Sequence, residues 1–359
     1  MARPNLAKKL EKKKAKLNYE WYSIRSMLGY SWALFLMLLG GREAGKSYTV
    51  TDFFCRQWRK YGRPFYWMRL TETSQIKLLN NNAEKLIDPD IRRKYNLDLF
   101  VRGDAVYEVL ERFPDRRIKK KKLMARVLAL STFYNDKGSG LFDKDFLDDP
   151  NMYYNICLDE MNREQNEKRS FDILYAFTNQ LENLVRSTKT RLRVICIGNT
   201  LEEASDILCA FNFLPEEFGR YKLKKKRCVI DYIEPSEAYK NRRKGTIADI
   251  LMPNASTFTN EIKTDSSLVF KGRLLKPTAI IKFARGRENW FTIWDAKCVA
   301  QYNGEKGTVI AMRPYIDELF SAELRDSMIK MFDTRSFLFR NLITFKMFQK
   351  NLEILKPRK

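Results

Sequence analysis

A glycine-rich segment has the residue types and spacing of a phosphate-binding loop, the pattern G-x-x-x-x-G-K-[ST]. Its residues are Gly40, Gly41, Arg42, Glu43, Ala44, Gly45, Lys46 and Ser47. Gly40 and Gly45 permit tight turns, so that successive N–H groups and the start of the next helix can surround anionic phosphates. Lys46 is expected to reach the β- and γ-phosphates, and Ser47 to ligate Mg²⁺. Arg42 either assists the γ-phosphate or is a solvated loop residue.

Two further polar groups end apolar runs of the sequence. Asp159 and Glu160 end the run YYNICLDE, and Asn199 and Thr200 end the run LRVICIGNT. Beside a phosphate-binding loop, Asp159 is expected to hold Mg²⁺ and Glu160 to orient and deprotonate the attacking water. Alone, such a pair is often just the start of a helix. Asn199 or Thr200 is a candidate sensor of the γ-phosphate, and the alternative is an ordinary strand-end cap.

A basic group lies between these two runs, at Arg186, Lys189, Arg191 and Arg193. In a ring-shaped assembly, an arginine of one subunit can reach the nucleotide of its neighbour and stabilise the charge of the transition state. Arg186, at the end of a predicted helix, is the first candidate for this role, and Lys137 is a weaker one. The alternative is a solvated basic edge.

The elements that must position these residues alternate between strand-like and helical segments. Strands are expected at residues 34–39, 65–70, 127–133, 154–158 and 192–197, helices at 46–59 and 170–185, and a hairpin at 96–110. Strands separated by helices need crossover connections, which predicts an α/β fold with a mostly parallel sheet. The functional groups should then collect beyond the carboxyl ends of the strands.

Composition narrows the chemistry and the partners. The 359 residues contain 67 Lys and Arg, 44 Asp and Glu, and no histidine, so the net charge is +23. This excess favours a polyanion such as nucleic acid, and the alternatives are general solubility or an anionic membrane surface. Without histidine, Ser–His and Cys–His nucleophile pairs are excluded. The six cysteines show no CxxC spacing, which favours a reduced cytoplasmic protein, and the apolar run 33–39 is too short to span a bilayer.

Changes in composition suggest four parts. Residues 1–17 form a basic N-terminal arm, 18–200 the nucleotide-binding domain, 201–262 a small linker region with basic runs, and 263–359 a β-rich C-terminal domain. The last part has candidate strands at 278–283 and 290–294 and a basic helical segment at 328–355.

With these motifs in order, the chain resembles the DNA encapsidation ATPases of small podoviruses, whose motors pair the ATPase with a packaging RNA. The segments that carry the resemblance are Tyr22–Leu39, GRPFYWMRL, YNICLDE, RLRVICIGNT, NFLPEEFGRY and IADILMPNASTFTN. They cover most of residues 18–262. The phosphate-binding loop and the acidic pair are common to many ATPases, whereas the ordered set is specific to this family.

The resemblance implies a P-loop NTPase sheet of the ASCE or RecA-like type. It gives Lys46 and Ser47 the loop roles, Asp159 the Mg²⁺ role and Glu160 the role of catalytic base. Arg186 matches the family's trans-acting finger if a one-residue insertion follows it, and Arg69 matches a basic position after the second strand.

For the C-terminal part, the resemblance implies a ribonuclease-H-like domain without nuclease activity. A working nuclease of that class needs clustered carboxylates, and here Asp295, Asp317 and Asp326 are scattered along the sequence. It also implies a homo-oligomeric ring of five subunits at the portal of a procapsid in the host cytoplasm, acting on double-stranded DNA with no membrane partner.

The predicted function is therefore an ATP-driven double-stranded DNA translocase that packages a viral genome. Three alternatives stay open at this point. They are another DNA-dependent ring ATPase or helicase, a P-loop small-molecule kinase, and a non-catalytic nucleic-acid-binding protein.

Overall fold

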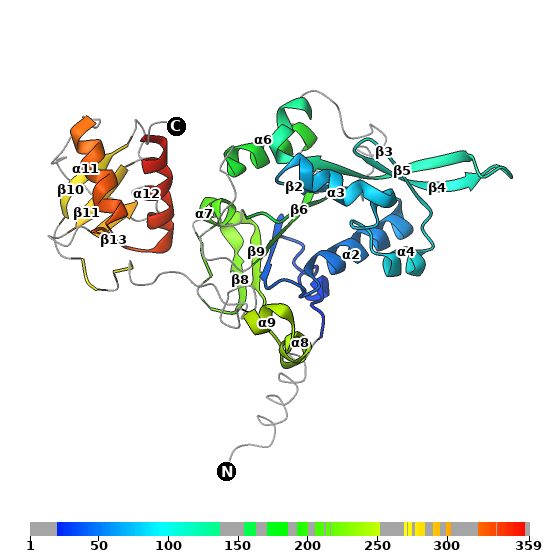
Figure 1. Ribbon diagram of the computed structural model, residues 1–359, viewed down its shortest axis with the longest axis horizontal. Helices are drawn as coiled ribbons and strands as arrows, with labels where there is room; N and C mark the ends of the chain where they lie inside the picture. Colours follow the sequence, from blue (N-terminus) through cyan, green and yellow to red (C-terminus); the bar gives the residue numbers. More distant parts are fainter. Residues whose placement is uncertain are drawn as a thin grey trace, which may run out of the picture. The chain divides into compact units, whose positions relative to one another are not determined.

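The computed structural model divides the chain into two compact units (Figure 1). The first comprises residues 1–201 and 215–261, and the second residues 202–214 and 262–359. The structure describes residues 20–136, 154–162, 171–185, 192–199, 205–211, 213–215, 217–251, 269–270, 272–274, 277–283, 290–294, 299–302, 322–334 and 336–355.

In the described part of the first unit, nine strands form one sheet. Their order is β3 (Leu99–Arg102), β4 (Ala105–Arg112), β5 (Ile118–Ala129), β2 (Phe65–Arg69), β6 (Tyr154–Asp159), β7 (Leu192–Asn199), β1 (Phe35–Gly40), β9 (Cys228–Tyr232) and β8 (Gly219–Leu223). The strands from β5 to β9 in this order are parallel to one another. β3, β4 and β8 pair antiparallel to their neighbours at the two edges. The predicted α/β fold with a mostly parallel sheet is confirmed.

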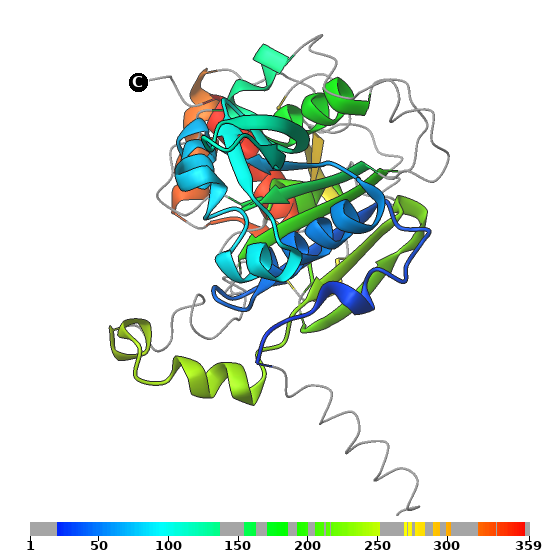
Figure 2. The same cartoon turned by 90° about the vertical axis from the view of Figure 1, so that its right-hand side faces the viewer.

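The helix that follows the phosphate-binding loop packs along this sheet, as the blue helix α2 shows in Figure 2. α2 (Lys46–Tyr61) places Val50, Phe53, Phe54 and Trp58 at the i, i+3, i+4 spacing of a buried helix face. These side chains join a core that includes strand residues of β1 and β2. Burial of this face fixes the helix, and with it the loop, against the end of β1.

Other helices and 3-10 turns lie in the described part of the first unit. They are η1 (Ile24–Ser26), α3 (Glu72–Ala83), α4 (Pro89–Tyr95), η2 (Leu130–Asp136), α6 (Ile173–Val185), η3 (Lys224–Lys226), α8 (Glu237–Arg243) and α9 (Ile247–Leu251). None of the described helices of the chain combines the length and apolar character needed to cross a bilayer.

The structure differs from the sequence-based elements at two places in this unit. The strand expected at 127–133 is β5, which begins nine residues earlier at Ile118 and ends at Ala129, before the 3-10 turn η2. The segment expected as a linker, 201–262, contributes β8 and β9 to the large sheet, because the apolar run of β9 pairs with β1 in parallel. The expected boundary at 262 agrees with the observed one to within one residue, whereas the expected linker is not a separate part, because residues 202–214 belong to the second unit and 215–261 to the first.

The second unit contains a four-stranded sheet among its described residues, with the order β10 (Pro277–Lys282), β11 (Trp290–Trp294), β12 (Val299–Tyr302) and β13 (Leu338–Phe339). Its described helices are α7 (Asp206–Ala210), α11 (Ala322–Asp333) and α12 (Leu342–Leu355). Phenylalanines dominate its core, among them Phe291, Phe339 and Phe348.

The helix expected at 328–355 is two helices, because Leu338 and Phe339 of β13 pair with β12 between them. Of the three scattered carboxylates, Asp326 lies on α11, whereas Asp295 and Asp317 lie outside the described residues. Among the residues that are described, no group of three carboxylates or cysteines is arranged to hold a metal ion.

Candidate nucleotide-binding site

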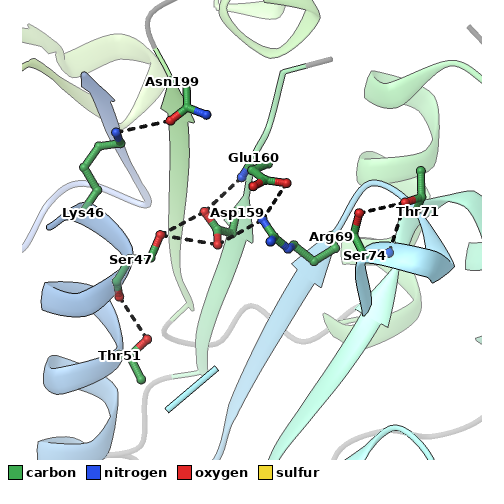
Figure 3. Close-up of polar contacts among 9 residues, drawn as sticks. All are labelled: Lys46, Ser47, Thr51, Arg69, Thr71, Ser74, Asp159, Glu160 and Asn199. Carbon is green, nitrogen blue, oxygen red and sulfur yellow. Dashed lines mark hydrogen bonds and ion pairs between the residues drawn. The ribbon is translucent and has the colours of Figure 1, made fainter. Parts of the chain in front are cut away.

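The carboxyl ends of four neighbouring parallel strands bring the predicted site residues together (Figure 3). Gly40 at the end of β1 lies opposite Asn199 at the end of β7, and Asp159 at the end of β6 lies opposite Ile197 of β7. Arg69 ends β2 on the other side of β6. The parallel register therefore gathers side chains that are up to 159 residues apart in the sequence, from Gly40 to Asn199.

The phosphate-binding loop joins β1 to α2 in a conformation that needs left-handed backbone at two positions. Gly45 has φ = 83°, and Glu43 has φ = 61°. A Cβ atom on Gly45 would lie 3.3 Å from the ring of Trp21, so a side chain there would be both strained and crowded. Gly45 thus permits the turn that directs the start of α2 toward the site.

Lys46 is buried in this loop, with 5% of its surface exposed. Its Nζ donates hydrogen bonds to the carbonyl oxygens of Gly40 at 2.7 Å and Gly41 at 2.5 Å, and lies 3.5 Å from Oδ1 of Asn199. Burial lowers the pKa of Lys46 to about 8, while the charge of Asp159 opposes this effect. The ammonium group is held where an anion would stabilise its charged form.

Ser47 and Asp159 form the oxygen pair expected for a magnesium ion. The Ser47 hydroxyl donates to the two carboxylate oxygens of Asp159 at 3.3 and 3.4 Å. Burial raises the pKa of Asp159, and the positive charge of Arg69 is the largest effect that opposes the rise. One hydroxyl and one carboxylate beside a triphosphate are the protein ligands that Mg²⁺ commonly uses. The residues present therefore fit the predicted ion.

Glu160 follows Asp159 with a left-handed backbone, at φ = 55°. This turn sends its side chain away from the buried strand, and the carboxylate is 51% exposed. Arg69 bridges the acidic pair, because its Nη1 lies 2.8 Å from Glu160 and 3.3 Å from Asp159. The role of Arg69 was not predicted from the sequence, which showed only a basic residue after a strand.

Asn199 is the predicted sensor residue that the structure describes. Its Oδ1 faces Lys46, and its backbone oxygen accepts a hydrogen bond from Nδ2 of Asn162 at 3.4 Å. The segment after the acidic pair also contacts β7, because the Met161 N–H donates a hydrogen bond to the carbonyl oxygen of Ile197 at 2.9 Å. Thr200, Arg186 and the weaker candidate Lys137 lie outside the described residues.

Side chains of helix α8 donate hydrogen bonds to the backbone of the phosphate-binding loop. The sequence did not reveal this contact. The carbonyl of Arg42 accepts hydrogen bonds from Tyr239 Oη at 2.8 Å and Arg243 Nη1 at 3.0 Å. Arg242 donates to the carbonyl of Glu43 at 2.5 Å, and its guanidinium lies 3.6 Å from the centre of the Trp21 ring.

A pocket of about 650 Å³ unites these groups. It is lined by Trp21, Arg42, Glu43, Ala44, Gly45, Lys46, Ser47, Tyr48, Asp159, Glu160, Ile197, Asn199 and Arg242. The lining contains cations from the loop side and carboxylates from the strand side, with an aromatic ring at Trp21. It thus has the chemistry to hold the charged and the flat parts of a nucleotide.

The parallel sheet, the loop between β1 and α2, and the acidic end of β6 define the fold of the P-loop NTPases. No protein-family model matches the chain. The chain is similar to the DNA packaging proteins of Bacillus phages phi29 and PZA, each 21% identical over 264 residues that cover 70% of this chain and 69% of the relative.

Two solved structures have the same fold over nearly the whole chain. The bacteriophage phi29 viral genome packaging motor assembly matches with a TM-score of 0.56 and 19% identity, covering 93% of this chain and all of the other. The phi28 gp11 DNA packaging motor matches with a TM-score of 0.56 and 14% identity, covering 95% and 99% of the two chains. The resemblance to phage packaging ATPases that the sequence indicated is confirmed.

Proposed function

We propose that this chain is the ATP-hydrolysing subunit of a motor that moves double-stranded DNA into a viral procapsid. The observation that carries the proposal is the meeting of Lys46, Ser47, Asp159 and Glu160 at one edge of the sheet. The relatives are named as DNA packaging proteins and parts of packaging motors, which supports the proposal that hydrolysis serves the packaging of DNA. The net charge of +23 suits a polyanionic partner.

The proposed chemistry is the transfer of the γ-phosphoryl group of ATP to water. Loop N–H groups and Lys46 bind the triphosphate, and Ser47 with Asp159 holds Mg²⁺, which neutralises phosphate charge when it is bound. Glu160 orients a water molecule and accepts its proton as the water oxygen bonds to the γ-phosphorus and ADP leaves. Asn199, beside Lys46, is positioned to contact the γ-phosphate side of the pocket.

The proposal extends to an assembly. In a homo-oligomeric ring, a pentamer by resemblance, Arg186 of one subunit would stabilise transition-state charge at the next subunit. The ring would act at the portal of a procapsid in the host cytoplasm, together with a packaging RNA. Residues 1–17 would serve as a basic arm, and the C-terminal unit as an inactive ribonuclease-H-like domain. The similar phi29 chain belongs to a viral genome packaging motor assembly, which supports this part of the proposal.

ATP turnover with and without long duplex DNA tests the proposal. Lys46→Ala should abolish turnover, and Glu160→Gln should lower it by roughly 10²- to 10⁴-fold while nucleotide still binds. Lys77→Ala and Glu182→Gln are matched controls, because both residues are exposed on helices of the same unit and do not line the pocket. Turnover that survives both site substitutions would contradict the proposal.

The same assay separates the rival functions. A translocase on duplex DNA should be stimulated by the duplex and leave its strands paired. Strand separation would favour a helicase, and turnover that ignores DNA but needs a small acceptor would favour a kinase. Binding of DNA with no turnover at all would favour a non-catalytic protein.

A further inference from the structure

The hairpin formed by β4 and β5 extends beyond the sheet to which it belongs (Figure 1). Ala125 of β5 lies opposite Phe65, the first residue of β2, so residues 118–124 pair with β4 alone among the described strands. With about 3.3 Å per residue, these seven residues advance the tip by roughly 23 Å. We refer to residues 110–122 as the hairpin arm.

The arm leaves the sheet at the end opposite to the nucleotide site. Phe65 is the amino end of β2, whereas Arg69 at its carboxyl end contacts Asp159 and Glu160. Since β5 is parallel to β2, the part of β5 that precedes Ala125 projects away from the pocket. Changes in the arm are therefore separated from the proposed chemistry.

The arm is strongly basic. It contains seven Lys and Arg residues and two acidic residues, a net charge of +5. Apart from Ile118, which is half-buried, each of its residues is exposed. In the described part of the chain, Arg116 and Lys120 have no carboxylate partner, whereas Lys119 pairs with Glu111 at 2.6 Å. A two-stranded ribbon that packs on nothing is only marginally stable by itself. Because the exposed residues of the arm add little to the core of the unit, the core does not explain why the arm extends beyond the sheet.

The cations of the arm lie on both of its faces. Side chains alternate along a strand, so Lys121 lies on one face of β5 and Lys120 and Lys122 on the other. Lys119 has no register partner in β4, because the register of the pairing shifts at that residue. Nearby rings hold two of these ammonium groups in place. Lys121 lies 4.4 Å from the ring centre of Tyr107, and Lys122 lies 5.1 Å from that of Trp58.

This two-sided charge distinguishes between partners. A flat anionic surface, such as a membrane or an acidic protein face, would meet only one face of the arm. The major groove of duplex DNA is about 12 Å wide, admits a two-stranded ribbon and has phosphates along both walls. We propose that the hairpin arm enters the major groove of duplex DNA and binds the phosphates on either side. Lysine–phosphate contacts carry no sequence information, which suits movement along any sequence.

This proposal rests on the proposed function, and its test keeps the two apart. The arm variant carries Arg116→Gln, Arg117→Gln, Lys119→Gln and Lys120→Gln. A matched variant removes the same charge at exposed positions elsewhere in the unit, with Lys77→Gln, Lys85→Gln, Lys224→Gln and Lys225→Gln. The full-length protein is titrated with duplex DNA and with duplex RNA over a range of salt concentrations. Basal ATP turnover is measured for each variant.

If two of the four cations bind phosphates, the slope of log affinity against log salt falls by about 1.8, and affinity at about 0.1 M salt falls roughly 60-fold. The matched variant should lose much less, and basal turnover should be unchanged in both. Equal losses in the two variants would overturn the proposal, as would an unchanged slope or a loss confined to duplex RNA. Wild-type protein that binds no duplex DNA would instead overturn the proposed function.

Discussion

Arg69 and the predicted magnesium ion compete for the same carboxylate, which leads to a prediction with an unusual sign. In the structure, the Arg69 guanidinium lies 3.3 Å from buried Asp159 and 2.8 Å from Glu160. Asp159 is also the carboxylate that would hold Mg²⁺. A divalent cation bound there would be repelled by the neighbouring guanidinium. Replacement of Arg69 by an uncharged residue should therefore lower the stability of the nucleotide-free protein but raise its affinity for Mg²⁺-nucleotide.

The size of the effect follows from the burial of the pair. Arg69 is 13% exposed and Asp159 8% exposed, measured on their side chains. Removal of one partner of a buried ion pair costs about 3–5 kcal/mol, and the partial exposure here reduces this to about 2–3 kcal/mol for the nucleotide-free protein. If Mg²⁺ restores about half of that loss, the variant should bind Mg²⁺-nucleotide about tenfold more tightly than the wild type.

The assay is a titration with a fluorescent ATP analogue, in Mg²⁺ and separately in EDTA. Arg69→Met keeps the apolar stem of the side chain and removes the charge, and Arg69→Lys is the control that keeps the charge. Arg69→Met should bind more tightly in Mg²⁺ and more weakly in EDTA, where the triphosphate loses a nearby cation. Weaker binding in both conditions would mean that Arg69 contacts phosphate directly, and the reasoning would be refuted.

Three further predictions concern the same pocket. Burial lowers the pKa of Lys46 to about 8, and a bound triphosphate should raise it again, so nucleotide binding should take up a proton and weaken as the pH rises above 8. Calorimetry in buffers of different ionisation enthalpy measures this proton uptake, and no uptake at pH 8–9 would be contrary evidence. Trp21→Ala should weaken ATP binding about tenfold, since stacking on a base contributes about 1–3 kcal/mol, but should leave inorganic triphosphate binding unchanged; equal losses for both ligands would exclude base stacking. Tyr239→Phe and Arg243→Met should each lower the free energy of unfolding by about 1 kcal/mol or less, because either donor alone still satisfies the carbonyl of Arg42. The double variant should lose more than the sum of the two single losses, and strict additivity in a double-mutant cycle would contradict this.

Much of the site could be predicted because its pattern is local. The loop residues 40–47 are contiguous, Asp159 directly follows an apolar run, and Asn199 follows another after Gly198. Parallel strands present their carboxyl ends at one edge, so the contact between Ser47 and Asp159 follows from the fold class without knowledge of the strand order. That contact, and the proximity of Lys46 to Asn199, are what the sequence leads one to expect.

The role of Arg69 could not be predicted in the same way. The sequence shows that it ends a strand, but its pairing with Glu160 depends on β2 lying next to β6. That order also depends on β5 lying on the other side of β2. Hydrophobic patterns identify strands and leave their order open, since one pattern is compatible with several crossover arrangements.

The strand in the hairpin arm could not be predicted from the hydrophobic pattern either. The run from Lys119 to Lys122 has charged side chains on both faces, so it lacks the alternation by which a half-buried strand is identified. It is a strand because β4 pairs with most of its residues, for example Glu108 with Lys122, although the register shifts near the tip. In an ordinary sheet such a segment would be shortened or covered, because neither face gains from burial. Neither face of this run is buried in the described part of the chain, and we attribute the arm to the contact with DNA proposed above. For this reason the charge on its two faces, rather than its apolar content, is the property that the DNA titration must test.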